Sequence, residues 1–115
     1  MRKAAALAVL VVLLTAFLLL EAVNTAGAAN AAPQIHTVLI EGMRYQPGGL
    51  TVAVGDTVVW INRDMVPHTA TSASGRFDSN EIAAGKSWTH TVQTKGEFAY
   101  TCAYHPLMKA LLRVR

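Results

Sequence analysis

The stretch that decides the fold of this chain is KGEFAYTCAYHPLM, residues 95–108. After the Lys-Gly turn, Phe98, Tyr100 and Cys102 occupy alternate positions, with smaller or charged residues between them. A period of two places the aromatic side chains and the thiol on one face of a β-strand. Because the aromatic face is the one that folding buries, the sequence predicts a strand over residues 97–102 that brings Cys102 to the core.

Outward from this stretch, short β-prone runs alternate with turn residues. Six of the expected strands can be bounded, at residues 35–40, 50–54, 57–61, 88–92, 97–102 and 111–114. Gly55-Asp56 separates two of these runs and predicts a hairpin-like junction. No segment of residues 35–115 carries a 3.6-residue apolar period over ten or more positions. The sequence therefore predicts an all-β domain, a Greek-key antiparallel β-sandwich of seven to eight strands.

The N-terminal segment has a different composition. Residues 1–3 include Arg and Lys, residues 4–20 are almost entirely apolar, and small residues follow. This order is typical of a secretory signal peptide. An uncleaved anchor helix is the alternative, since residues 4–20 just reach the roughly 17–25 residues that span a bilayer. We expect a signal peptide or anchor at residues 1–28, a linker at 29–34 and one domain at 35–115. The protein would then be periplasmic or otherwise exported, and membrane-bound only if residues 4–20 remain.

The charge balance and the cysteine count narrow the possible functions. The 115 residues carry ten Lys and Arg against seven Asp and Glu, a net charge of +3, without a cluster of basic residues. This argues against nucleic-acid binding, which needs a basic patch that follows phosphates. Cys102 is the single cysteine, so it has no partner for an internal disulfide. In an oxidising compartment a free thiol is at risk, and a bound metal ion would protect it.

Three metal donors follow one another after the predicted strand: the thiolate of Cys102, the imidazole of His105 and the thioether of Met108. His68 is the candidate for a second imidazole, although the fold has to bring it across 34 positions. A Cys and two His with a long, weak axial Met is the donor set of a type 1 copper site. Zinc also binds Cys and His, but a thioether suits it poorly. The sequence therefore predicts one type 1 copper ion, with Met65 as the reserve axial donor.

Together these stretches resemble the cupredoxins, and among them the amicyanin and plastocyanin group. The matching segments are VVWINR at residues 58–63, Pro67-His68, KGEFAY at residues 95–100 and Cys102-x-x-His105-Pro106-x-Met108. The resemblance implies an exported blue copper protein that carries one electron at a time. It implies four copper ligands: His68, Cys102, His105 and Met108. Thr69 departs from the family pattern, in which Asn often follows the first His.

The resemblance also implies redox partner proteins, a donor and an acceptor, that dock near His105, Pro106 and Leu107. We expect a monomer. A copper-handling protein on the same fold, acting as a chaperone, scavenger or sensor, is the alternative function. An enzyme is not expected, because oxidases and nitrite reductases need further copper sites and the chain has no His-x-His pair. His36 and His90 are expected to be packing residues rather than ligands.

Overall fold

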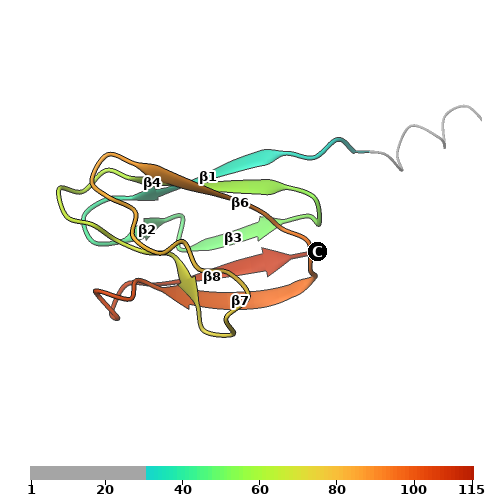
Figure 1. The fold of residues 1–115 in the computed structure, drawn as a ribbon. Coiled ribbons are helices and arrows are strands. Elements are labelled where there is room, and N and C mark those ends of the chain that lie inside the picture. The colour runs from blue at the N-terminus through green and yellow to red at the C-terminus, as the bar shows by residue number, and fades with distance from the viewer. Residues whose placement is uncertain (1–30) are drawn as a thin grey trace, which may run out of the picture. The chain divides into compact units, whose positions relative to one another are not determined.

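The computed structural model of the protein describes residues 31–115. The predicted signal peptide or anchor at residues 1–28 lies outside the described residues, as does the start of the predicted linker at 29–34. In the described part, no helix is long and apolar enough to cross a membrane. Eight strands form the domain (Figure 1): β1 Ile35–Ile40, β2 Tyr45–Gln46, β3 Gly49–Val52, β4 Thr57–Asn62, β5 Thr71–Ser72, β6 Ser87–Thr91, β7 Gly96–Thr101 and β8 Lys109–Val114.

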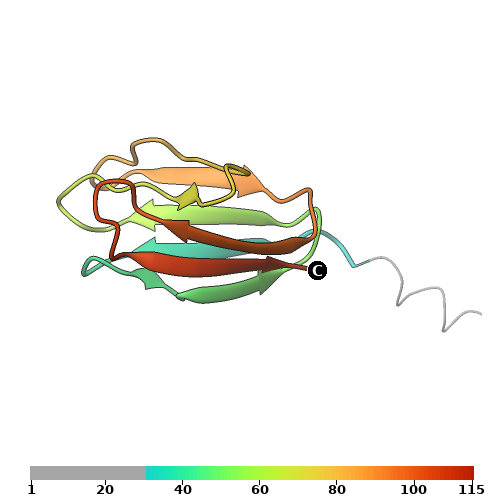
Figure 2. The ribbon, with the colours of Figure 1, turned by 90° about the horizontal axis from the view of Figure 1, so that it is seen from below.

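The strands form two sheets that pack face to face (Figures 1 and 2). One four-stranded sheet has the order β2-β1-β4-β6, and the other has the order β3-β8-β7-β5. The predicted β-sandwich is confirmed. All six predicted strands are present, with ends that differ from the prediction by at most two residues.

Both sheets are mixed rather than purely antiparallel. β1 runs parallel to β4 and β3 runs parallel to β8, while the other pairs are antiparallel. The Gly55-Asp56 junction is therefore not a hairpin, because β3 and β4 belong to different sheets. The Asp56 carboxylate stabilises this connection between the two sheets, because it accepts hydrogen bonds from the N–H groups of Ala53 (3.0 Å) and Gln34 (2.9 Å). Turn residues indicate where a chain reverses, but they do not determine which strands pair.

Alternate residues of the strands point inward and fill the space between the sheets. In β4, Val58, Trp60 and Asn62 are buried, whereas the residues between them are partly exposed. Trp60 lies at the centre, with ring-centroid distances of 5.7 Å to both Phe77 and Tyr100. Its indole N–H donates to the Tyr100 hydroxyl (3.3 Å), so the polar atom is also satisfied. Trp60 is fully buried and is therefore a core residue.

The segments that carry the predicted metal donors lie together at one end of the sandwich. Residues 63–70 follow β4, and residues 102–108 join β7 to β8; both lie away from the C-terminus, on the left of Figure 1. Asn62 ties the first segment to its surroundings, because its side-chain amide donates to the carbonyls of Val66 and Ile82, both at 2.9 Å. We call this region the loop end.

Candidate metal centre

The backbone of His68 is held in place by two hydrogen bonds with the backbone of Ile82. Its N–H donates to the carbonyl of Ile82 (3.1 Å), and the N–H of Ile82 donates back to the carbonyl of His68 (2.7 Å). The imidazole is fully buried, a position in which both ring nitrogens need partners. Both have one: Nδ1 faces the sulfur of Cys102, and Nε2 faces the carboxylate of Asp64.

The loop of residues 102–108 is closed by backbone hydrogen bonds. The N–H of Cys102 donates to Met108 (3.2 Å), that of Met108 to His105 (2.9 Å), and that of His105 to Cys102 (3.3 Å). The sheet holds both sides of the loop, since β7 and β8 pair up to its edge at Thr101 and Lys109. Cys102 and Met108 are buried, while His105 is only partly buried. The loop thus keeps one imidazole near the surface.

Three donor atoms converge on one point. The sulfur of Cys102 lies 3.7 Å from Nδ1 of His68 and 3.7 Å from Nδ1 of His105. The three atoms all lie within 4.8 Å of one another. A metal ion about 2.0 Å from each nitrogen and about 2.3 Å from the sulfur, with angles near 120°, separates sulfur from nitrogen by about 3.7 Å. The residues therefore fit a single trigonal metal ion.

Thr69 joins the two segments that carry the donors. Its backbone N–H points at the sulfur of Cys102 (3.3 Å), and its hydroxyl accepts the N–H of Ala103 (2.8 Å). The hydroxyl also contacts that of Thr71 (2.8 Å). An N–H directed at the sulfur stabilises a thiolate over a thiol. Thr69 thus makes the bracing contacts at the position where the sequence departs from the Asn of the family pattern.

Asp64 is a part of the site that sequence reasoning missed. Its Oδ2 lies 2.8 Å from Nε2 of His68. Its carboxylate also accepts the N–H groups of Gly42 (2.8 Å) and Met43 (3.0 Å), two successive residues with positive φ angles of 63° and 59°. Burial acts to raise the pKa of the Asp64 carboxyl, but the N–H donors of Met43 and Gly42 and the imidazole of His68 outweigh it, so the pKa is lowered. A carboxylate behind a ligating histidine orients the ring and increases its basicity.

No sequence signal identified Asp64, because an acidic residue in a polar loop is ordinarily solvated. The positive φ of Gly42 and Met43 is what aims two N–H groups at one carboxylate, and this conformation favours glycine at the first position.

The two methionines that the sequence suggested as axial donors differ in their exposure to solvent. Met65 is 95% exposed, which argues against it as the reserve axial donor. Met108 is 4% exposed and lies in the closed loop with Cys102 and His105. Axial ligation by Met108 stays a prediction.

A β-sandwich that gathers two imidazoles and a buried thiolate at one end defines a class of single-ion metalloproteins with a soft donor set. Its donors suit copper. The chain belongs to the cupredoxin family: the cupredoxin-like domain matches residues 7–114. Copper is the cofactor that the family and the three-donor group together identify.

Relatives of known identity agree with this assignment. The amicyanin of Paracoccus denitrificans is 32% identical over 87 residues, which cover 71% of this chain and 66% of that protein. The amicyanin of Paracoccus versutus is 28% identical over the same coverage. The chain thus spans just under two thirds of the length of these curated relatives.

Solved structures share the fold. An amicyanin variant in its Cu(I) form has a TM-score of 0.67 and 31% identity, covering 76% of this chain and 89% of that one. A copper-containing nitrite reductase from Thermus scotoductus has a TM-score of 0.66 and 27% identity, but the match covers only 23% of the enzyme. The likeness to the enzyme is therefore a likeness to one part of it.

Proposed function

We propose that this protein is a type 1 copper protein that carries single electrons between redox partners. Its ligands would be Nδ1 of His68, Sγ of Cys102 and Nδ1 of His105, with the thioether of Met108 as the axial donor. The observation that carries the proposal is the pair of 3.7 Å distances from one buried sulfur to two imidazole nitrogens. When bound, copper supplies a centre that gains and loses one electron.

A rigid donor set favours electron transfer. The ring of His68 is held by Asp64, Cys102 accepts the N–H of Thr69, and the loop that carries His105 is closed by three backbone hydrogen bonds. Donors that already lie in position need little rearrangement when the charge of the site changes. Burial of the thiolate also excludes water and oxidants from it.

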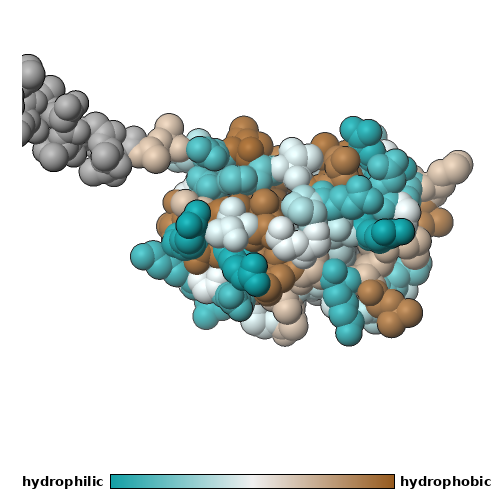
Figure 3. Space-filling view, turned by 180° about the vertical axis from the view of Figure 1, so that it is seen from behind, coloured by the Kyte–Doolittle hydropathy of each residue, from teal (hydrophilic) through white to brown (hydrophobic). Residues whose placement is uncertain are grey.

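The route to partner proteins follows from the surface around His105. Pro106 is exposed and Leu107 is 94% exposed, although the exposure of an apolar leucine side chain to water is unfavourable. Tyr104, Met65 and Val66 are 49%, 95% and 44% exposed. Figure 3 shows apolar side chains standing out at the loop end, on the right of that view. We assign this apolar surface to the brief docking of a donor and an acceptor, with His105 as the electron's point of entry and exit.

Export is part of the proposal and rests on the sequence. The basic start, the apolar run of residues 4–20 and the small residues after it suit a signal peptide, or an anchor if cleavage fails. A copper-capped thiol suits an oxidising compartment such as the periplasm. The protein would act there as a monomer.

Copper handling is the second candidate. One observation favours it: the thioether of Met65, a soft donor suited to Cu(I), is almost fully exposed three residues before His68. The burial of Cys102 and His68 favours electron transfer instead, since an exchanging site needs access to its donors. Catalysis is not proposed, because residues 31–115 contain a single cluster of this kind.

Copper reconstitution tests the proposal. The Cu(II) form should be intensely coloured through charge transfer from the thiolate, with the narrow copper hyperfine splitting of a type 1 centre in EPR. Cys102→Ser is the matched control and should lose the colour. Reversible voltammetry together with slow copper loss to a chelator supports an electron carrier. A colourless Cu(II) complex contradicts the proposal, and rapid copper transfer without electron exchange favours handling.

A further inference from the structure

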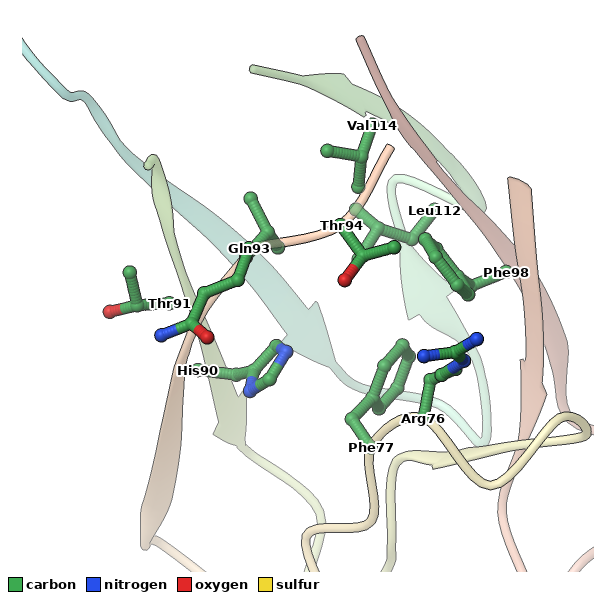
Figure 4. A pocket seen from close by; sticks show the side chains of 10 residues that line it. Arg76, Phe77, His90, Thr91, Gln93, Thr94, Phe98, Leu112 and Val114 are labelled. Carbon is green, nitrogen blue, oxygen red and sulfur yellow. The ribbon is translucent and has the colours of Figure 1, made fainter. Parts of the chain in front are cut away.

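A cleft lies on the flank of the sandwich, away from the metal donors. It has a volume of about 390 Å³ and opens between the edge strand β6 and the strands β7 and β8. Its lining combines the apolar side chains of Phe77, Phe98, Leu112 and Val114 with the polar side chains of Arg76 and His90. Figure 4 shows these side chains turned toward a shared central space.

Arg76 gives the cleft a positive charge, and none of the ion pairs among the described residues includes it. Arg76 is exposed, and its side chain is one of those that line the cleft in Figure 4. A planar guanidinium binds carboxylates and sulfonates through paired N–H donors and stacks on aromatic rings.

The side chain of His90 is held firmly. Its ring stacks on Trp88 at 5.4 Å with an interplanar angle of 11°, and it lies 5.4 Å from the ring of Phe77. The packing role expected for His90 is therefore present, but the ring also borders the cleft. Burial lowers the pKa of His90 and so favours the uncharged ring, in which one nitrogen donates a hydrogen bond and the other accepts one.

From these features we propose that the cleft binds a small amphipathic anion, namely a planar aromatic body that carries one carboxylate or sulfonate group. The aromatic body would lie on Phe77 and Phe98, and the anionic group would meet Arg76. The volume is within the range of about 300–1,000 Å³ that is typical of small-molecule sites. The site is separate from the metal centre, since Phe98 precedes Cys102 by four residues, about 13 Å along β7.

Fluorescence titration of the purified full-length protein with anilinonaphthalene sulfonate tests this proposal. We expect one site per chain, and Arg76→Gln should weaken binding at least about tenfold because it removes a charge-assisted contact. Arg63→Gln, at the loop end, is the matched control and should leave the affinity unchanged. Phenylnaphthylamine, which lacks the sulfonate, should bind equally to the parent protein and to Arg76→Gln.

The position of the dye is read from NMR shifts. Signals of Gln93, Thr94 and the His90 ring should move on dye addition, while those of His105 and Leu107 stay in place. Equal dye affinities for the parent and Arg76→Gln overturn the proposal. So do shifts confined to the loop end, or binding that Leu107→Ser abolishes. None of these results depends on the redox function.

Discussion

The carboxylate of Asp64 lies 2.8 Å from Nε2 of His68, while Nδ1 of the same ring faces the sulfur of Cys102 at 3.7 Å. One buried imidazole thus links a carboxylate, itself held by two backbone N–H groups, to the metal donors. This relationship fixes which nitrogen of His68 is free to bind a metal, because the nitrogen that faces the carboxylate carries the proton.

Asp64→Asn should weaken copper binding by about 10–100-fold, the usual effect of losing a carboxylate behind a ligating histidine. It should also raise the reduction potential, because a nearby negative charge stabilises the oxidised ion more than the reduced one. Chelator competition and voltammetry measure the two effects. Glu41→Gln, an exposed carboxylate near the same turn, is the control. An unchanged affinity in Asp64→Asn would show that the ring needs no such support.

Met108→Gln tests the axial donor. The colour should remain, because the thiolate and both imidazoles are intact, while the reduction potential should fall, since an axial oxygen donor suits Cu(I) less than a thioether does. Met65→Gln is the matched control, because Met65 is exposed. If both variants keep the parent potential and EPR spectrum, Met108 is a packing residue only.

Thr69→Val should destabilise the folded protein by about 1 kcal/mol, because the N–H of Ala103 loses the hydroxyl that accepts it. Thr69→Ser retains the hydroxyl and should recover most of this loss. Urea unfolding of the copper-free and copper-bound forms gives both values. Full stability of the valine variant together with a loss in the serine variant would mean that the methyl packing of Thr69 matters, and its hydroxyl does not.

Asp56 should make the stability of the domain depend on pH in acid. The N–H groups of Gln34 and Ala53, together with the His36 side chain, lower the pKa of Asp56 to about 2, whereas an unfolded Asp titrates near 3.9. Between these values the unfolded chain binds the proton and the folded chain does not. The contribution of Asp56 is therefore complete above about pH 4 and is lost as the pH falls toward 2.

Urea midpoints from pH 5 to pH 2 measure this dependence. The copper-free variant Cys102→Ser avoids interference from metal release. Adding Asp56→Asn should make the pH curve less steep, and adding Glu81→Gln, an exposed carboxylate, should not. Parallel curves for the two combinations would exclude Asp56 as the titrating group.

Leu107→Ser should slow electron exchange with partner proteins without changing stability, because Leu107 is 94% exposed. The electron self-exchange rate, measured by NMR line broadening in mixtures of the oxidised and reduced forms, reports on this surface. Ile35→Ser, which replaces a side chain 75% exposed at the opposite end of the sandwich, is the control. Equal rates in both variants would place electron exit elsewhere.

Local patterns in the sequence predicted the parts of the fold that depend on local preference. The alternation over residues 97–102 gave β7 and the burial of Tyr100 and Cys102, and residues 35–40 were predicted with the bounds they have in β1. Pairing was harder to predict. Gly55-Asp56 has the composition of a hairpin turn, yet it connects two sheets, because the partners of β3 and β4 lie far away in the chain.

The site was predictable to the extent that donor chemistry is visible in residue types. Cys102 and His105 lie in one short loop, and His68 follows a recognisable Pro67. The supporting contacts were not visible. Thr69 and Asp64 act through backbone geometry, and their partners Ala103, Gly42 and Met43 come from distant segments.

Two of the outermost strands are very short: β2 and β5 contain two residues each and form edges of the two sheets. Such edges offer too little unpaired backbone to recruit a strand from a neighbouring molecule. A protein that binds one partner briefly and then another benefits from having few sheet edges to which a further molecule can add a strand. The short edge strands β2 and β5 would therefore limit aggregation of the protein at high concentration.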